Sequence, residues 1–211
     1  MNKHGTILPR AYFNRPALQV ARGLLGKYLL RCTETGLLAG RIVEVEAYVG
    51  PEDLACHASK GRTKRTDVLF GPPGIAYVYL IYGMYHCFNV VTERDGYPAA
   101  VLVRGIELDR PTANMMATAS NAVPMLIDGP GRLCRVLQID LNLNRWDLTK
   151  GQMLWLEDRK ERVSPSQMTA SPRIGVDYAG EWAAKPWRFR IPPRFTAASP
   201  PRRSTRTRIS R

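Results

Sequence analysis

The sequence lacks the long apolar segment that a membrane-spanning helix requires. None of its 211 residues belong to an apolar run that approaches roughly 18 in length. The polar segment from Met1 to Gly5 is not followed by the apolar core of a secretory signal. We therefore expect a protein that is soluble and not secreted.

Cysteine is scarce and widely spaced. The four cysteines are Cys32, Cys56, Cys87 and Cys134, and no two of them form a Cys-x-x-Cys pair. This spacing argues against a zinc knuckle and against a redox couple, so we expect reduced and mostly buried thiols and no bound metal.

Acidic residues are also few. There are 18 of them against 31 lysines and arginines, which gives a net charge of +13 and favours a polyanionic partner. The segment 192–211 has six arginines, no acid and almost nothing apolar to bury, which leaves +7 on residues 1–191. We predict one folded domain over 1–191, because domains centre on roughly 100–150 residues, and a disordered basic tail over 192–211.

Apolar periodicity indicates both helix and strand. Apolar residues recur at helical spacing from Ala17 to Leu30, which predicts a helix that covers one face of a sheet. From Ile42 to Tyr48 the period becomes two, with an apolar face opposite Glu44 and Glu46.

The middle of the sequence predicts three strands in an antiparallel meander. Segments 75–82 and 85–91 flank Gly83 and Met84 as a hairpin, and 99–106 follows a turn at Asp95 and Gly96. The polar segment 51–66 indicates a surface loop. A helix is expected after Gly129. The free N–H groups at its start either bind a phosphate, or the Gly-Pro-Gly segment before it only turns the chain.

Two acids on one strand face are candidates for a general base. A partly desolvated Glu46 can activate water, a role that contributes roughly 10²- to 10⁴-fold in rate. A solvated glutamate on a half-exposed sheet explains the same pattern, and Glu44 has the same periodicity. Spacing alone does not choose between them.

Aromatic and basic side chains are interleaved further along the chain. Four tyrosines lie between 77 and 85, after the basic loop 60–65. Such surfaces suit unpaired bases and backbone phosphates, although tyrosine is also common in strands. His57 is one of three histidines, and Arg104 lies within the apolar strand 99–106, where a guanidinium needs an acidic or carbonyl partner.

These residues belong to long ordered motifs. The motifs are, in chain order, Arg41-Ile-Val-Glu-Val-Glu-Ala-Tyr-Val-Gly-Pro-Glu-Asp53, His57, Tyr77-Val-Tyr-Leu-Ile-Tyr-Gly-Met-Tyr85, Asn89, Ala100-Val-Leu-Val-Arg104, Gly129-Pro-Gly-Arg-Leu-Cys134, Arg173-Ile-Gly-Val176 and Trp187-Arg-Phe189. Together they cover nearly everything before the tail. With these motifs the chain resembles the alkyladenine (3-methyladenine) DNA glycosylase family.

The resemblance implies an α+β fold: a single domain with a curved antiparallel β-sheet, a protruding β-hairpin and flanking helices. It implies a DNA glycosylase that flips alkylated or deaminated purines from duplex DNA for base excision repair. Glu46 then matches the general base, Arg104 the arginine that helps hold the attacking water, and Glu44 a supporting acid. Glu46 can also stabilise the oxocarbenium character that develops on the sugar.

The resemblance also assigns a base pocket. Tyr48, His57 and Tyr79 match residues that sandwich and border the flipped base, and Asn89 matches a residue that screens purines by clashing with the guanine amino group. Tyr82 matches the side chain that intercalates into the vacated stack. An aromatic cage favours a cationic ring through cation–π attraction.

Further expectations concern the DNA surface and the products. We assign Arg62, Lys64, Arg65 and Arg132 to contacts with the DNA backbone. No lysine adjoins Glu46 on its strand, so we expect a monofunctional enzyme that leaves an abasic site. We expect no cofactor and no metal, a monomer, and a location in the cytoplasm with the nucleoid in a bacterium or in the nucleus of a eukaryote.

Two other function classes compete with this hypothesis. A non-catalytic DNA or RNA-binding protein can use the same basic and aromatic surface, and a hydrolase of free nucleosides breaks the same bond. A pure binder needs no acid facing an anionic backbone, and a nucleoside hydrolase needs neither an intercalating tyrosine nor a charge of +13. The basic tail adds non-specific DNA affinity, serves as an address signal, or is inert.

Overall fold

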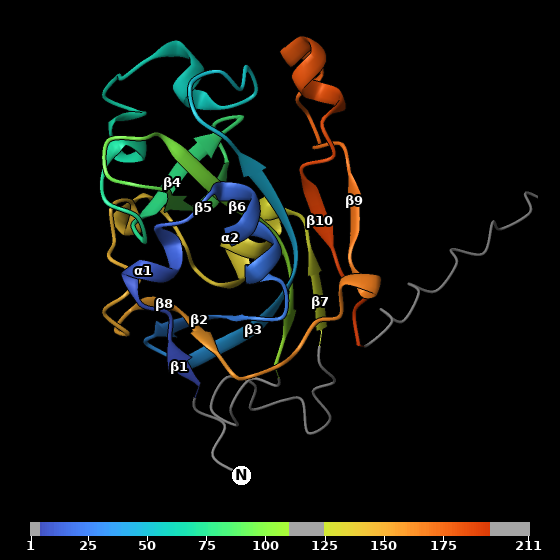
Figure 1. Cartoon of the computed structure of the whole chain (residues 1–211). Helices are drawn as coiled ribbons and strands as arrows, with labels where there is room; N and C mark the ends of the chain where they lie inside the picture. The colour runs from blue at the N-terminus through green and yellow to red at the C-terminus, as the bar shows by residue number, and fades with distance from the viewer. Residues whose placement is uncertain (1–4, 110–124, 195–211) are drawn as a thin grey trace, which may run out of the picture.

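A curved antiparallel sheet forms the centre of the molecule. The computed structural model describes residues 5–109 and 125–194 (Figure 1). The strands of the described residues are β1 (Thr6–Ile7), β2 (Tyr28–Thr33), β3 (Gly36–Tyr48), β4 (Ala76–Ile81), β5 (Tyr85–Thr92), β6 (Ala99–Leu108), β7 (Met125–Asp128), β8 (Leu154–Asp158), β9 (Thr169–Ser171) and β10 (Arg188–Arg190). Their main order is β1-β8-β2-β3-β6-β5-β4.

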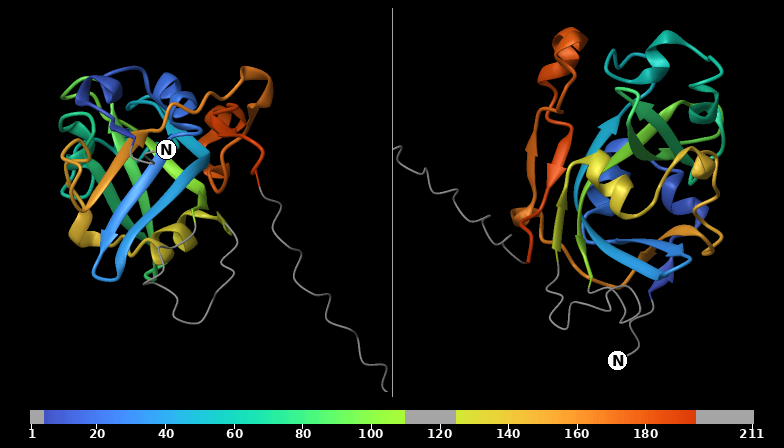
Figure 2. Two further views of the ribbon diagram at one scale, coloured as in Figure 1. Left: turned by 90° about the horizontal axis from the view of Figure 1, so that it is seen from below. Right: turned by 180° about the vertical axis from the view of Figure 1, so that it is seen from behind.

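Short helices flank this sheet. The helices of the described residues are α1 (Arg10–Phe13), α2 (Ala17–Leu24), α3 (Pro130–Val136) and the 3-10 helices η1 (His57–Lys60), η2 (Asp67–Phe70), η4 (Leu141–Leu143), η5 (Pro165–Gln167) and η6 (Asp177–Ala184). α2 packs on β3 and β6, as Figure 2 shows from two further sides. The predicted fold class, α+β in a single domain, is therefore confirmed. Within the described ranges no helix could cross a membrane.

The predicted helix over 17–30 is wrong in its second half. α2 ends at Leu24, and the chain returns as strand β2 from Tyr28. Leu25 is extended, and Gly26 has φ +81°, a left-handed conformation that a side chain disfavours, so the helix cannot continue. Because Tyr28 to Leu30 are buried, this strand lacks the polar alternation that marks a half-exposed one.

The long strand β3 changes partner along one edge. Its first half pairs with β2 and its second half with β10, while the other edge pairs with β6. The register with β6 shifts between Ile42 and Val45, which is the mark of a bulge. Bulges bend a sheet and redirect side chains. The two candidate acids, Glu44 and Glu46, therefore lie where the sheet bends.

The predicted meander is confirmed. β4 pairs with β5 and β5 with β6, all antiparallel, and the hairpin turn contains Tyr82 at φ +52° and Gly83 at φ +70°. The side chains of Val101 and Val103 join the main apolar core, whereas Ala100 belongs to a second cluster on the other face. This alternation is the one that the period of two predicts.

Other expectations are only partly met. The predicted surface loop 51–66 has no strand, but it contains η1, and two of its residues are fully buried: Asp53, which is bonded to Arg173, and Ala58, which belongs to an apolar cluster. β7 was not expected, and it closes the edge of β6 beyond β5. The tail expected over 192–211 lies outside the described residues from 195 on, so the division at residue 191 stays a prediction.

The cysteines match their prediction in the main. Cys56, Cys87 and Cys134 are buried, Cys32 is exposed, and all four are free thiols. Cys32 differs because it lies toward the end of β2, where the strand reaches solvent.

Candidate active site

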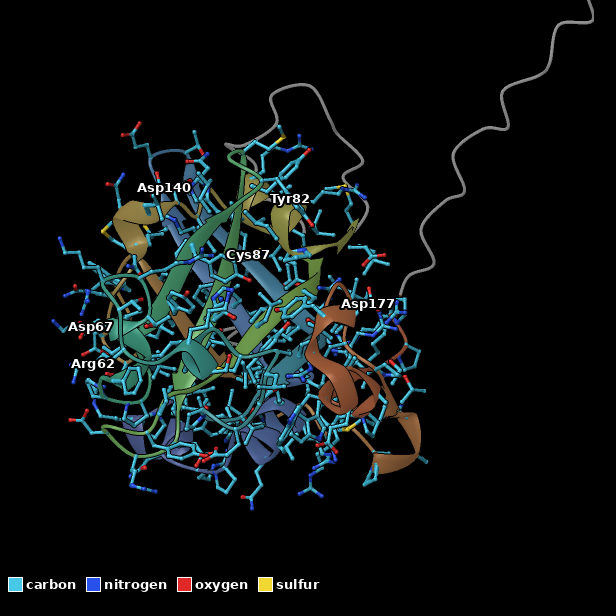
Figure 3. All side chains as sticks on the ribbon, turned by 90° about the horizontal axis from the view of Figure 1, so that it is seen from above. Arg62, Asp67, Tyr82, Cys87, Asp140 and Asp177 are labelled. Atoms are coloured by element: carbon cyan, nitrogen blue, oxygen red, sulfur yellow. The ribbon has the colours of Figure 1, made fainter. Side chains whose placement is uncertain are left out.

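A cavity of about 390 Å³ opens beside the hairpin. Strands β4, β5 and β6 form one wall, the loop 55–69 a second, and the segment 174–178 a third. Its lining residues are Tyr48, Ala55, Cys56, His57, Arg65, Leu69, Tyr77, Tyr79, Ile81, Tyr82, Cys87, Asn89, Ala100, Leu102, Arg104, Pro130, Ile174, Gly175, Val176 and Tyr178. Figure 3 shows Cys87 between the loop that carries Arg62 and the segment that carries Asp177. The cavity volume suits one small planar ligand.

Glu46 lies directly behind the cavity wall. Its carboxylate is fully buried and does not itself line the cavity. Its three partners do: the Tyr48 hydroxyl donates to Oε2 at 2.9 Å, the Ile174 N–H donates to Oε1 at 2.8 Å, and Arg104 Nε lies 3.4 Å from Oε1. Burial raises the pKa of the Glu46 carboxyl above 4.5, against the opposing effect of these donors.

Arg104 is shared between two acids. Its Nε donates to Glu44 Oε1 at 3.0 Å, and its Nη1 lies 3.5 Å from Glu46 Oε2. Glu44 also lies near two strand β10 arginines, with 3.2 Å to Arg190 and 3.8 Å to Arg188. Spacing could not separate the two acids, but their surroundings differ. Glu46 lies against the cavity wall, and Glu44 is surrounded by arginines.

His57 is held among aromatic rings. Its Nδ1 shares a hydrogen bond of 2.8 Å with the Tyr77 hydroxyl, and its ring meets Tyr79 edge to face with centroids 4.7 Å apart. Burial lowers the pKa of His57 to about 4, and the nearby Arg65 and Lys60 add to this effect. The imidazole is therefore neutral near pH 7. Tyr77 was quoted in the motif without a role, and its contact with His57 could not be read from spacing.

Asn89 and Tyr82 both line the cavity, Asn89 at its buried part and Tyr82 at its exposed rim. Asn89 is buried, and its side-chain amide donates to the Tyr77 carbonyl at 3.1 Å. Tyr82 is 82% exposed at the end of the hairpin, next to Met84, which is 67% exposed. Figure 3 shows Tyr82 on the outer part of the hairpin. The cavity thus has a polar buried residue and an aromatic side chain at its rim.

The four predicted DNA-contacting residues are not in one place. Arg62 and Lys64 line a shallow open depression with Asp67 and Arg145, and Arg132 is exposed in α3. The Asp67 carboxylate accepts from Arg62 Nε at 2.7 Å. Arg65 differs from the other three.

Arg65 lines the base-sized cavity. Its guanidinium carbon lies 5.1 Å from the centroid of the Tyr79 ring. The sequence placed Arg65 with the loop's other cations because consecutive positions in a loop give no direction to a side chain.

A buried ion pair supports the segment that reaches Glu46. Arg173 donates from Nη1 to Asp53 Oδ2 at 2.5 Å and from Nη2 to Asp53 Oδ1 at 2.8 Å, and both side chains are fully buried. Arg173 also donates to the Ala47 carbonyl at 2.9 Å, and its guanidinium carbon lies 4.8 Å from the Tyr48 ring centroid. The pair fixes the backbone just before Ile174. Residues 120 apart give no local signal, so the sequence could not reveal it.

Metal ligation has no visible basis in the residues described. Among them, no group of three or more His, Cys, Asp or Glu side chains is placed to hold an ion. The expectation of a reaction without metal or cofactor remains a prediction.

The chain is similar to known proteins over most of its length. A family model described as methylpurine-DNA glycosylase matches residues 11–194. A protein of Methanocella arvoryzae is 51% identical over 186 residues, which cover 87% of this chain and 91% of the relative. A protein of Myxococcus xanthus is 50% identical over 182 residues, covering 86% and 88%.

A third relative gives the same result. A protein of Legionella pneumophila (strain Corby) is 48% identical over 186 residues, covering 87% of this chain and 93% of the relative. All three carry the name "Putative 3-methyladenine DNA glycosylase". The resemblance noted from the motifs is confirmed, and so is the enzyme class: the chain belongs to the methylpurine-DNA glycosylase family.

Proposed function

We propose that this enzyme flips alkylated or deaminated purines out of duplex DNA into the 390 Å³ cavity and hydrolyses their N-glycosidic bond with a water activated by Glu46. The product is an abasic site for base excision repair. One observation carries the proposal: a fully buried carboxylate is held behind the wall of an aromatic cavity by three groups that line it. The names of the relatives, which specify 3-methyladenine, agree with a damaged purine as substrate.

The chemistry requires a base near the sugar. Cleavage of the C1′–N bond gives the sugar oxocarbenium character, and a carboxylate there both stabilises the charge and takes a proton from water. Glu46 has the raised pKa that suits this role. The contact of 3.5 Å between Arg104 Nη1 and Glu46 Oε2 is long, so a water that bridges the two groups replaces it at little cost.

The flipped base stacks among Tyr48, His57 and Tyr79. Stacking contributes about 1–3 kcal/mol per base. Since His57 is neutral near pH 7 and its Nδ1 is bonded to the Tyr77 hydroxyl, its Nε2 is left to make one hydrogen bond at the base edge, as acceptor or as donor according to the tautomer. Asn89 lies buried at the same cavity, where its amide opposes the amino group of guanine.

Tyr82 fills the space that the flipped base leaves. It is exposed at the hairpin turn, so its ring is free to enter a stack of bases. We predict that Tyr82→Ser weakens binding to lesion-containing duplex more than binding to undamaged duplex, measured by fluorescence anisotropy. Equal losses on both duplexes would argue against a wedge.

Contacts to the DNA backbone come from Arg62 and Lys64, which are exposed in the basic loop, and from Arg132, which is exposed in α3. Their charges release counterions on binding, which makes the affinity fall steeply with salt. No lysine lines the cavity among the residues that the structure describes. This arrangement supports a monofunctional reaction, without an amine nucleophile and without strand cleavage.

The test of the proposal is Glu46→Gln. We expect excision from a lesion-containing duplex to fall by at least roughly 10²-fold while DNA binding persists, because the general base is lost and the shape is kept. Alkaline cleavage of the abasic product measures the single-turnover rate. Glu181→Gln, which changes an exposed acid outside the cavity, serves as the control and should keep the wild-type rate. Full activity of Glu46→Gln would refute the role.

A further inference from the structure

Arg65 occupies a place that its neighbours in the basic loop do not share. Lys64 and Arg62 face the open depression beside Asp67, whereas Arg65 lines the cavity and lies over the Tyr79 ring at 5.1 Å. One face of a ring proposed to contact the flipped base is therefore already in contact with a cation. An alkylated base, which is itself a cation, would have to share this aromatic surface with the Arg65 guanidinium.

The charge of Arg65 is not balanced at the cavity wall. No aspartate or glutamate lines the cavity, and no ion pair to Arg65 is seen, among residues 5–109 and 125–194. The other lining guanidinium, Arg104, is different because it pairs with Glu44 at 3.0 Å and lies near Glu46. Burial and Arg65 together keep His57 neutral by lowering its pKa to about 4. The base-binding end of the cavity thus carries a net positive charge.

This charge has opposite effects on two kinds of damaged purine. A cationic alkylated base is repelled when it enters, because like charges at short range interact strongly in a partly desolvated site. A neutral deaminated base gains negative charge on its ring as the glycosidic bond breaks, since the bonding electrons leave with the base. A fixed cation stabilises that developing charge in the transition state.

We propose that Arg65 is a specificity-determining residue that shifts the enzyme toward neutral purine lesions and away from cationic ones. This inference rests on the proposed function, because it concerns the leaving base of that reaction. It assigns Arg65 to the cavity rather than to the DNA backbone, where the sequence alone had placed it. It concerns the ratio of two rates and not the presence of either activity.

The experiment compares Arg65→Gln with the wild type on two duplexes that differ only in the lesion, hypoxanthine or 7-methylguanine. Single-turnover excision is measured at mildly acidic pH, where 7-methylguanine carries its positive charge. We expect the ratio of hypoxanthine rate to 7-methylguanine rate to fall by about tenfold, a value reduced for solvent screening because Arg65 is exposed. Arg65→Lys keeps the charge and should keep most of the ratio.

Lys64→Gln is the matched control. It removes one charge from the adjacent position, which faces away from the cavity, and should lower both rates by a common factor. An equal loss of both rates in Arg65→Gln, or a wild type that removes only 7-methylguanine, overturns the proposal. If the wild type excises neither base, or if Glu46→Gln remains active, the proposed function itself is refuted and this inference with it.

Discussion

Two buried charge clusters lie on either side of Tyr48, and they are built differently. Asp53 and Arg173 form a closed pair: both are fully buried, two hydrogen bonds of 2.5 and 2.8 Å join them, and the Val49 and Ala55 N–H groups complete the carboxylate's partners. Every oxygen of Asp53 has short donors. Such a matched pair holds loops in place.

The second cluster is open. Glu46 and Glu44 share one Arg104, and the contacts of Arg104 with Glu46 are 3.4 and 3.5 Å. Burial raises the pKa of Glu46, and the neighbouring Glu44 adds to this. The difference teaches that burial of charge alone does not mark a reactive site. Among the described residues, Glu46 has short hydrogen bonds only from uncharged donors, Tyr48 and Ile174, and its one cation is distant and shared, so its carboxylate is not neutralised as Asp53 is and can act as a base.

The largest expected effect is on the closed pair. Asp53→Asn leaves Arg173 charged and buried with a neutral partner, so we expect the free energy of unfolding to fall by about 3–5 kcal/mol. Urea denaturation measures it. The double variant Asp53→Asn with Arg173→Met should recover part of the loss, because the unpaired charge is gone. A loss below about 1 kcal/mol in the single variant would contradict the closed-pair description.

The next effect separates the two acids of the open cluster. Glu44→Gln removes the short partner of Arg104 but leaves Glu46 behind the cavity wall. We expect excision to slow by about tenfold, well short of the loss in Glu46→Gln, since Glu44 acts on the reaction through Arg104. Single-turnover rates of the two variants give the comparison. A loss as large as that of Glu46→Gln would mean that the roles of the acids are not distinct.

The smallest expected effect is on the pH dependence of the free energy of unfolding. The folded-state pKa of Glu46 is raised above its unfolded value near 4.5, so the native state is favoured while the group is protonated. Its contribution is lost as pH rises through the folded pKa, because a buried carboxyl must then ionise. The variant Glu46→Gln lacks this decline.

The corresponding measurement is urea denaturation of both proteins from pH 4.5 to neutrality. We expect Glu46→Gln to gain in unfolding free energy relative to the wild type as pH rises. A constant difference between the two proteins over this window would show that Glu46 ionises without cost in the folded state.

Local pattern was enough to predict part of the fold and the site. The alternation along β3 placed Glu44 and Glu46 opposite the core, and the turn residues Gly83 and Met84 located the hairpin with Tyr82 in its turn. These features depend on residues that are neighbours in sequence. The roles of individual site residues, in contrast, came from the family motifs and remain proposals.

Long-range pairing could not be predicted. The Asp53–Arg173 pair, the Ile174 N–H bond to Glu46 and the pairing of β10 with β3 join residues more than 100 positions apart. The helix over 17–30 was overextended because a fully buried strand and a helix both read as apolar runs. The sequence did not separate Arg65 from the other cations of its loop for a related reason, since sequence does not give the direction of a loop side chain.

Glu46 lies on a strand that is paired on both edges, with Arg188 on β10 and Leu102 on β6 opposite it, and its side chain has no exposed surface. The backbone beneath it is thereby held on both sides, so access depends on the cover that Tyr48, Ile174 and Arg104 make over the carboxylate. Carboxyl-directed reagents such as carbodiimides should label the surface acids of the free enzyme long before this one. The rate of labelling at Glu46 would then report how often its cover opens, which makes the buried acid a natural probe of site breathing.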